Sequence, residues 1–379
     1  MKSIKTTLSK SLKDNNYYNP NTINAVDGLL AYVVALLLMF LLGKVLDAPI
    51  KALVNNKVIT DYFLWQIILG IITQGAILVV AIIFFKFKKV SVFSGNGYSF
   101  KTNMIDLLMS VLLVLGVGLC FNALHFDFYD DMTGIFGDLG LTVSQSVIDK
   151  SNFIYIVIYA FLLVPILPAI IEEMLFRGVV MRGMESKGAV FSIIGSSVLF
   201  STMHGSVGML ILQFFVGLSI AVVVTLTKNH LYGVAMHFSN NLFLSVLVAL
   251  PELASEFIPH SENVVSAFVT IFGLVFLLVS AFYFFKKYTA KFKTEILGIK
   301  KQKSRFDNPL TVCYTLKDRC DREYCLKDFD NLDKTITQNK DFVFLYKDEF
   351  CFLNKQSNNV LTYGLFVLAL VLSLVRIFI

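Results

Sequence analysis

Four polar side chains in otherwise apolar stretches of the chain have the types that acid–base chemistry requires. Glu172 follows a proline-containing apolar stretch, and His204 ends a second one. His237 and Asn241 lie four residues apart in a third, and therefore on one helix face. A carboxylate beside an imidazole can act as a general base toward water, and an imidazole with an amide can hold an oxyanion. These residues predict hydrolysis of an amide bond by an activated water, without a covalent intermediate.

A second acidic residue, Glu173, adjoins Glu172. Glu173 and Arg177 are four residues apart, so on a helix they share a face and can pair. Such pairing is the usual condition for burying a charge. Because a helix turns by about 100° per residue, Glu172 points in another direction. We therefore expect Glu173 and Arg177 to support the structure and Glu172 to face the interior of a helix bundle. The alternative is that both glutamates lie solvated at a surface.

The same side chains could instead hold a metal ion. Two histidines and one carboxylate form a known catalytic zinc set, which Glu172, His204 and His237 would supply here. No His-Glu-x-x-His motif is present, so the ligands would come from three separate helices. The residues leave open whether no cofactor is required or a divalent metal such as zinc is bound. They also leave open that His204 only caps a helix end, and that His237 and Asn241 only link helices.

The composition indicates an integral membrane protein. Of the 379 residues, 56% are hydrophobic and 16% are charged, whereas soluble domains have about 45–50% and about 25%. Apolar stretches of ~17–25 residues are candidates for spanning helices. They lie at Gly28–Leu46, Tyr62–Phe85, Met104–Leu124, Phe153–Leu167, Val190–His204, Val207–Thr227, Leu231–Leu250, Val264–Phe285 and Val360–Ile379. Pro165 and Pro168 interrupt the fourth stretch, so we expect a new helix to begin at Pro168.

The predicted fold is an all-α polytopic membrane protein. It has a polar N-terminus (1–27), an eight-helix membrane core (28–285), a cytoplasmic segment (286–359) and a ninth transmembrane helix (360–379). The cytoplasmic segment is rich in Lys, Asp and Asn, and Phe342–Tyr346 and Phe350–Leu353 have the pattern of two short strands about a polar turn. We expect a small α+β appendage there, which could bind a protein partner. Its cysteines form no Cys-x-x-Cys pair, so reduced thiols are favoured over a zinc site.

Lysine and arginine set the expected orientation, because they accumulate in cytoplasmic loops. Lysines mark the N-terminus and the stretch after the second apolar segment, Arg177, Arg182 and Lys187 precede the fifth, and a dense basic run follows the eighth. Two of the alternate loops are acidic. The pattern predicts a multi-pass protein of the cell membrane with a cytoplasmic N-terminus and an external C-terminus. The net charge of +6 reflects these topology signals, and no nucleic-acid partner is expected.

The ordered motifs resemble those of the CPBP intramembrane protease family, which includes CAAX prenyl endopeptidases and bacteriocin-processing or self-immunity proteins. They read Glu172-Glu173-Met-Leu-Phe-Arg177, Phe200-Ser-Thr-Met-His204 and His237-Phe-Ser-Asn-Asn241. The resemblance covers roughly residues 150–250. It implies an eight-helix protease with a cavity open to the cytosol, in which Glu172 and His204 activate water and His237 and Asn241 hold the oxyanion. Family members have been described both as metalloproteases and as metal-independent glutamate-type proteases.

The resemblance also suggests the class of partner. The expected substrate is a membrane-associated peptide within the lipid bilayer. The Lys-, Asn- and Phe-rich composition is typical of a low-GC bacterium, so peptide maturation, bacteriocin immunity or regulated processing is favoured over cleavage of a prenylated tail. Two other classes remain open: a non-enzymatic membrane regulator that binds a partner through 286–359, and a transporter with a Glu/His proton relay. The lack of an internal repeat makes the transporter the least favoured.

Overall fold

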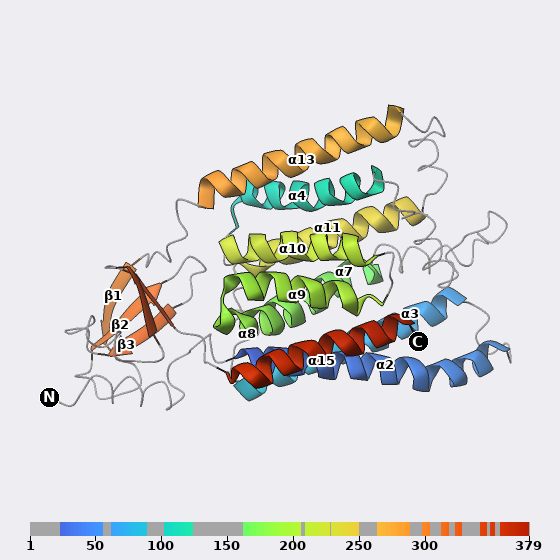
Figure 1. Cartoon of the computed structure of the whole chain (residues 1–379), viewed down its shortest axis with the longest axis horizontal. Coiled ribbons are helices and arrows are strands. Elements are labelled where there is room, and N and C mark those ends of the chain that lie inside the picture. The colour runs from blue at the N-terminus through green and yellow to red at the C-terminus, as the bar shows by residue number, and fades with distance from the viewer. Residues whose placement is uncertain are drawn as a thin grey trace.

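The described part of the chain is a bundle of helices joined to a few short strands. The computed structural model describes residues 23–55, 62–88, 102–123, 162–205, 209–227, 229–249, 264–288, 298–303, 312–317, 323–327, 342–346, 349–352 and 357–378. Its long helices are α2 (Ala25–Asn55), α3 (Tyr62–Lys88), α4 (Met104–Ala123), α7 (Ile166–Leu175), α9 (Ala189–Met203), α10 (Leu210–Thr227), α11 (His230–Ala249), α13 (Val264–Tyr288) and α15 (Asn359–Phe378). Figure 1 shows them lying roughly parallel, from α13 and α4 at one edge to α15, α2 and α3 at the other.

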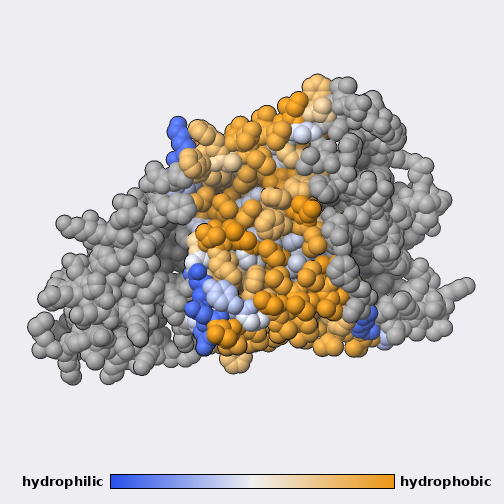
Figure 2. All heavy atoms as spheres, in the orientation of Figure 1, coloured by the Kyte–Doolittle hydropathy of each residue, from blue (hydrophilic) through white to orange (hydrophobic). Residues whose placement is uncertain are grey.

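Six of these helices are long and apolar enough to cross a membrane: α2, α3, α4, α10, α13 and α15. Their candidate spans are between 18 and 22 residues long, close to the ~20 residues that a bilayer requires. Figure 2 shows a broad apolar band over the helices, with hydrophilic residues gathered at its edges. Phe272, Leu278 and Phe282 of α13 are each more than half exposed, which is favourable only against lipid. The chain is therefore a multi-pass membrane protein, as its composition predicts.

The helical run that carries the two glutamates differs from the prediction. The helix α7 begins at Ile166 rather than Pro168. Pro168 is tolerated because it occupies the first turn, where the backbone N–H has no partner within the helix. The run continues as the π-helical segment η4 (Phe176–Met181), then α8 (Arg182–Met184) and the 3₁₀ segment η5 (Glu185–Lys187). Most of the predicted stretch Phe153–Leu167 lies outside the described residues.

This continuous run also corrects the interpretation of two basic residues. Arg177 is fully buried and Arg182 is 4% exposed, so neither is the loop charge that the orientation argument took it to be. An arginine that is buried inside a helix bundle interacts with the side chains around it, so it does not report on which side of the membrane a loop lies. Of that group only Lys187 remains near an end of the bundle, where its ammonium group donates to the Ser357 carbonyl just before α15.

Helices α4 and α13 cross at very short range because glycines lie at their contact. A Cβ atom on Gly116 would come within 2.7 Å of the Leu277 nitrogen, and one on Gly273 within 2.9 Å of the Cys120 nitrogen. Small residues that let backbones approach closely are a common means of packing helices in membranes. This contact joins α13, which is mostly exposed, to the rest of the bundle.

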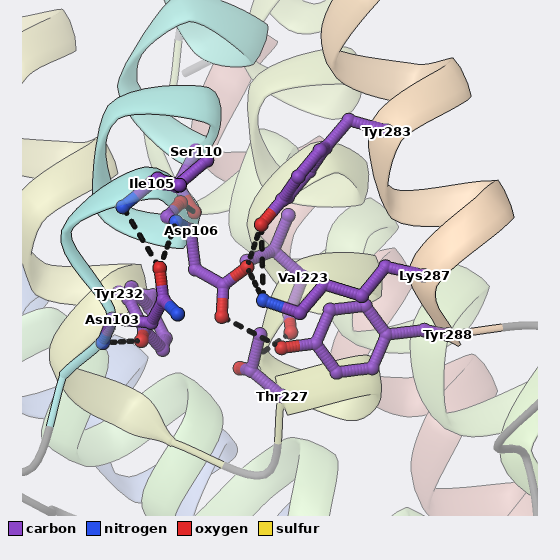
Figure 3. A network of polar contacts seen from close by, with 10 residues as sticks. All are labelled: Asn103, Ile105, Asp106, Ser110, Val223, Thr227, Tyr232, Tyr283, Lys287 and Tyr288. Atoms are coloured by element: carbon purple, nitrogen blue, oxygen red, sulfur yellow. Dashed lines mark hydrogen bonds and ion pairs between the residues drawn. The ribbon is translucent and has the colours of Figure 1, made fainter.

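One end of α4 and α13 is held by a polar cluster around a buried carboxylate. Asp106 of α4 accepts hydrogen bonds from the Tyr283 hydroxyl (2.6 Å), the Lys287 ammonium group (2.6 Å) and the Tyr288 hydroxyl (2.9 Å), all of α13. Figure 3 shows the three donors converging on the carboxylate from one side. The Asp106 side chain is 5% exposed and that of Lys287 is 33% exposed. Both oxygens of the carboxylate thus have a partner, which indicates that this cluster has a structural role in linking α4 to α13.

Replacing Asp106 by alanine is expected to lower the free energy of unfolding by about 2–3 kcal/mol, because a charged hydrogen-bond acceptor is removed while its donors stay partly buried. Thermal unfolding of the full chain in lipid nanodiscs would measure the change. Ser110→Ala is the matched control, since the Ser110 hydroxyl donates only to the carbonyl of Asp106 in its own helix. Equal effects of the two substitutions on the unfolding temperature would contradict the structural role of the Asp106 cluster.

Short strands lie between α13 and α15. The strands β1 (Gly298–Lys303), β2 (Val312–Lys317) and β3 (Glu323–Lys327) form one antiparallel sheet in sequence order. The strands β4 (Phe342–Tyr346) and β5 (Glu349–Phe352) pair antiparallel, with Phe342 opposite Phe352. These last two strands lie where the sequence predicts a pair of strands, within one residue at each end. Figure 1 shows β1–β3 beyond one end of the helices.

Candidate functional site

The candidate site forms where α7 lies between α3 and α11. Glu172 and Glu173 are in the second turn of α7, and His237 and Asn241 are on one face of α11. His204 directly follows α9 as its C-terminal cap. The ring of Phe200 links the two histidines, with centroid distances of 4.9 Å to His204 and 5.4 Å to His237. The structure therefore brings the predicted residues to one place.

Glu173 and Arg177 form the predicted ion pair. The Nε atom of Arg177 lies 3.2 Å from Oε2 of Glu173, and both side chains have no exposed surface. The Arg177 guanidinium also donates to the Gly217 carbonyl through Nη2 (3.2 Å) and lies over the Phe200 ring at 5.4 Å. These contacts compensate for the burial of a cation in a bundle. They also connect η4 to α9 and α10.

Glu173 has a second contact that the sequence does not reveal. Its other oxygen, Oε1, lies 3.2 Å from Nδ1 of His237 on α11. Because an ionised carboxylate can only accept, Nδ1 is the donor and the neutral imidazole keeps a lone pair on Nε2. A Cβ atom on Gly233, one turn earlier, would lie 2.8 Å from Oε2 of Glu173. Glycine at this position therefore lets α11 approach the buried pair.

Glu172 is separate from the ion pair, as its position on the helix predicts. Its Oε1 accepts a 2.9 Å hydrogen bond from Nε2 of Gln74 on α3. Its Oε2 lies 4.0 Å from Nε2 of His237, and the Glu172 side chain is 13% exposed. A polar separation of this size is wide enough for a bridging water. One oxygen of the carboxylate is thus fixed by Gln74, and the other faces the imidazole.

Gln74 is a site residue that the sequence reasoning missed. It is an amide in the middle of a long apolar helix, and a polar side chain in such a position was the available signal. Its Nε2 is the atom bonded to Glu172, because two oxygens would repel each other. Its Oε1 is buried and has no hydrogen-bond partner among the described residues. A buried acceptor without a partner is costly, so this atom marks a place for a donor.

Although His204 ends an apolar stretch, the structure does not bury its side chain. It is exposed, and its Nδ1 lies 2.8 Å from the Phe200 carbonyl of the preceding turn. A carbonyl can only accept, so Nδ1 carries the proton and Nε2 is available for acid–base chemistry. The Glu172 carboxylate is near enough to act on this imidazole electrostatically. The helix ends here because Gly205 adopts a positive φ of 74°, a common way to end a helix.

Asn241 lies one turn beyond His237 on α11 and contacts the backbone just before α7, the helix that carries Glu172 and Glu173. Its Nδ2 donates to the Val164 carbonyl at 3.3 Å, and its Oδ1 accepts from Asn240 at 3.2 Å. An amide nitrogen has two hydrogens, so one N–H remains after the bond to Val164. The fixed orientation of this amide follows from its two neighbours.

Comparison with known proteins gives one decisive result. Residues 152–243 match the family described as type II CAAX prenyl endopeptidase Rce1-like. This part of the chain is therefore similar to the CAAX-protease family. The matched segment contains all four residues singled out for chemistry, and it confirms the resemblance seen in the motifs. No curated protein and no solved structure matches the chain. The activity that the CAAX-protease family implies is that of an endopeptidase.

The CAAX-protease motif residues can be tested for a metal site. A divalent ion would need Glu172, His204 and His237 to converge. Both histidines have Nδ1 in a hydrogen bond and Nε2 free, which suits zinc ligands and their supporting groups. However, among the described residues no three His, Cys, Asp or Glu side chains are placed to hold one ion. The donor types fit a metal ion, but the arrangement of the described side chains does not.

Proposed function

We propose that the protein is an intramembrane endopeptidase that hydrolyses a peptide bond of a membrane-associated peptide by a water activated by Glu172 and His204. The observation that supports this most is the placement of Glu172. One of its oxygens is bound by Gln74, and the other lies 4.0 Å from an imidazole nitrogen of His237. A carboxylate held in this way has a defined free oxygen, which can share a water with the imidazole nitrogen.

The proposed reaction has two steps. In the first, Glu172 takes a proton from the water, whose oxygen attacks the carbonyl carbon of the substrate, and the carbonyl oxygen becomes an oxyanion. In the second, the C–N bond breaks and the amine nitrogen takes a proton, delivered from Glu172 through His204. The products are a carboxylic acid and an amine, which become a carboxylate and an ammonium group when the acid's proton passes to the amine, so no covalent enzyme intermediate and no further reactant is needed.

The oxyanion would be held by His237 and the second N–H of Asn241. The hydrogen bond to Glu173 assigns one imidazole proton to Nδ1, so Nε2 can donate to the oxyanion only when it also carries a proton. Carboxylates at both ring nitrogens, Glu173 at 3.2 Å and Glu172 at 4.0 Å, are suitably placed to accompany that imidazolium. Glu173 thus has a role beyond pairing with Arg177, because it sets the orientation of His237.

The proposed orientation keeps the N-terminus in the cytoplasm and the C-terminus outside. Basic residues at the ends of helices support it: Lys86 and Lys88 end α3, and Lys286 and Lys287 end α13. With the N-terminal end of α2 inside, both of these ends fall on the same, cytoplasmic side, as the positive-inside rule requires. The strands between α13 and α15 follow the same end of α13, so a protein partner of 286–359 would be cytoplasmic.

Comparative peptidomics of membranes tests the function even while the substrate is unidentified. Cells would express the wild type, Glu172→Ala or the control Glu185→Ala, whose carboxylate lies in η5, beyond the motif. We expect a set of peptides that is released by the wild type and the control and is absent with Glu172→Ala. The same peptides in all three samples would contradict the function and favour a non-enzymatic regulator. Repeating the comparison with a chelator, then with added zinc, tests the metal question.

Gln74→Leu is expected to lower the cleavage rate by about 10-fold while the protein stays folded, because the Glu172 carboxylate loses a fixed hydrogen bond. Gln74→Glu would place a second negative charge beside Glu172 and shift the pH dependence of the rate to higher pH. The measurement is the release of the identified product from membranes over a range of pH. Thr73→Val is the control, since Thr73 donates only to carbonyls of its own helix. An unchanged pH profile in Gln74→Glu would contradict the proposed contact.

A further inference from the structure

The last helix, α15, contributes to the candidate site although it lies outside the matched segment 152–243. It packs against α2 and α9, and Figure 1 shows it crossing in front of α2. Its position is fixed by the Tyr32 hydroxyl, which lies 2.6 Å from the Ser373 hydroxyl and donates to the Leu199 carbonyl at 3.1 Å. These contacts join three helices that are far apart in sequence.

One turn after Ser373, α15 places Arg376 beside His204. The Nη1 atom of Arg376 donates to the Met203 carbonyl at 2.6 Å. Its guanidinium carbon would lie 3.6 Å from a Cβ atom on Gly205. The cation therefore contacts the residues directly before and after His204. It also acts electrostatically on both His204 and Glu172.

Arg376 differs from Arg177 because it has no counter-ion among the described residues. Arg177 has Glu173 at 3.2 Å, whereas no carboxylate among the described residues lies within ion-pair distance of Arg376. It lies one residue before the end of the apolar candidate span Asn359–Ile377, where the guanidinium group is near the edge of the bilayer and open to a ligand. A guanidinium has five N–H donors, and only one hydrogen bond from Arg376 to a described residue is present. The remaining donors match the geometry of a carboxylate, which guanidinium binds in a bidentate manner.

We propose that Arg376 is a carboxylate-binding residue of the candidate active site, where it holds a carboxylate of the peptide substrate beside His204. The proposal rests on the proposed function, because it takes the ligand from the substrate. The carboxylate has two sources, the C-terminus of the peptide or an acidic side chain near the cleaved bond. In either case Arg376 selects and positions the substrate, and α15 confers a specificity that the matched segment alone does not contain.

Binding to an inactive protein tests the proposal separately from cleavage. The full-length Glu172→Ala protein in zwitterionic nanodiscs would be titrated with four N-myristoylated pentapeptides. They combine a free or amidated C-terminus with a central Glu or Gln, and the shift in thermal unfolding reports binding. We expect at least one carboxylate to strengthen binding, and Arg376→Gln to weaken that peptide by ~10- to 100-fold, the effect of losing a charge-assisted hydrogen bond. Arg376→Lys should retain part of the affinity, because it keeps the charge without the bidentate geometry.

The binding experiment separates the two sources of the carboxylate from the results that would contradict the proposal. A preference for the free C-terminus or for the central Glu identifies the source of the carboxylate and supports the proposal. Equal binding of all four peptides, or the same loss in the exposed-charge control Lys86→Gln, would overturn it. A dependence on Arg376 that appears only with anionic lipid would assign the residue to the bilayer surface and also overturn it. If the protein binds the carboxylate but the wild type cleaves no peptide, the proposed function is contradicted and the carboxylate-binding site is still supported.

Discussion

Glu172→Gln is expected to reduce peptide-bond cleavage by about 10²–10⁴-fold, the usual contribution of a general base. Glutamine keeps the size of the side chain and can still accept from Gln74, so the hydrogen bond at Oε1 survives while the basic oxygen is lost. The rate would be measured with purified protein and the peptide identified by the peptidomic comparison. The structure predicts an unchanged unfolding temperature, because Glu172 is not part of the buried ion pair.

The matched control is Glu185→Gln in the same helical run. Because Glu185 lies in η5 rather than in the glutamate pair, its substitution should leave the rate within about twofold of the wild type. Cleavage by Glu172→Gln at the rate of the control would remove Glu172 from the mechanism.

Arg177→Ala is expected to have the largest effect on folding. It would leave the Glu173 carboxylate buried without a cation, at a cost of about 3–5 kcal/mol. It would also open space beneath the ring of Phe200. Loss of folded protein in detergent and a lower unfolding temperature in nanodiscs would measure the effect.

The double substitution Arg177→Met with Glu173→Gln separates charge from packing. It removes both charges and keeps similar volumes, so it should recover most of the lost stability. Activity should not recover with it, because a glutamine no longer ensures that Nδ1 of His237 carries the proton. Recovery of both stability and activity would show that Glu173 serves only the ion pair.

The sequence predicts the helices well because apolar length and composition report directly on a membrane environment. It also predicts the pairing of Glu173 with Arg177 and the separate direction of Glu172, since both follow from the turn of a single helix. Contacts between helices could not be obtained in this way. The bonds of Glu173 to His237 and of Gln74 to Glu172 depend on how α3, α7 and α11 pack, and Arg376 reaches the site through a helix that the motifs do not include.

The burial of Arg177 and Arg182 shows a limit of a different kind. Counting basic residues assumes that each lies in a loop, and this assumption fails for a charge that is buried inside the bundle. The exposure of His204 has a similar origin: a helix-terminal residue is placed by the end of the helix, and the glycine after it adopts a positive φ.

The Tyr32 hydroxyl joins α2, the first described helix, to α9 and to α15, the last. During synthesis α15 is the final described helix to leave the ribosome, so neither this junction nor the Arg376 contact can form until it is inserted. The proposed active site would remain incomplete while the rest of the bundle is already in the bilayer. Such an order of assembly would prevent cleavage of neighbouring membrane peptides before the chain is fully inserted.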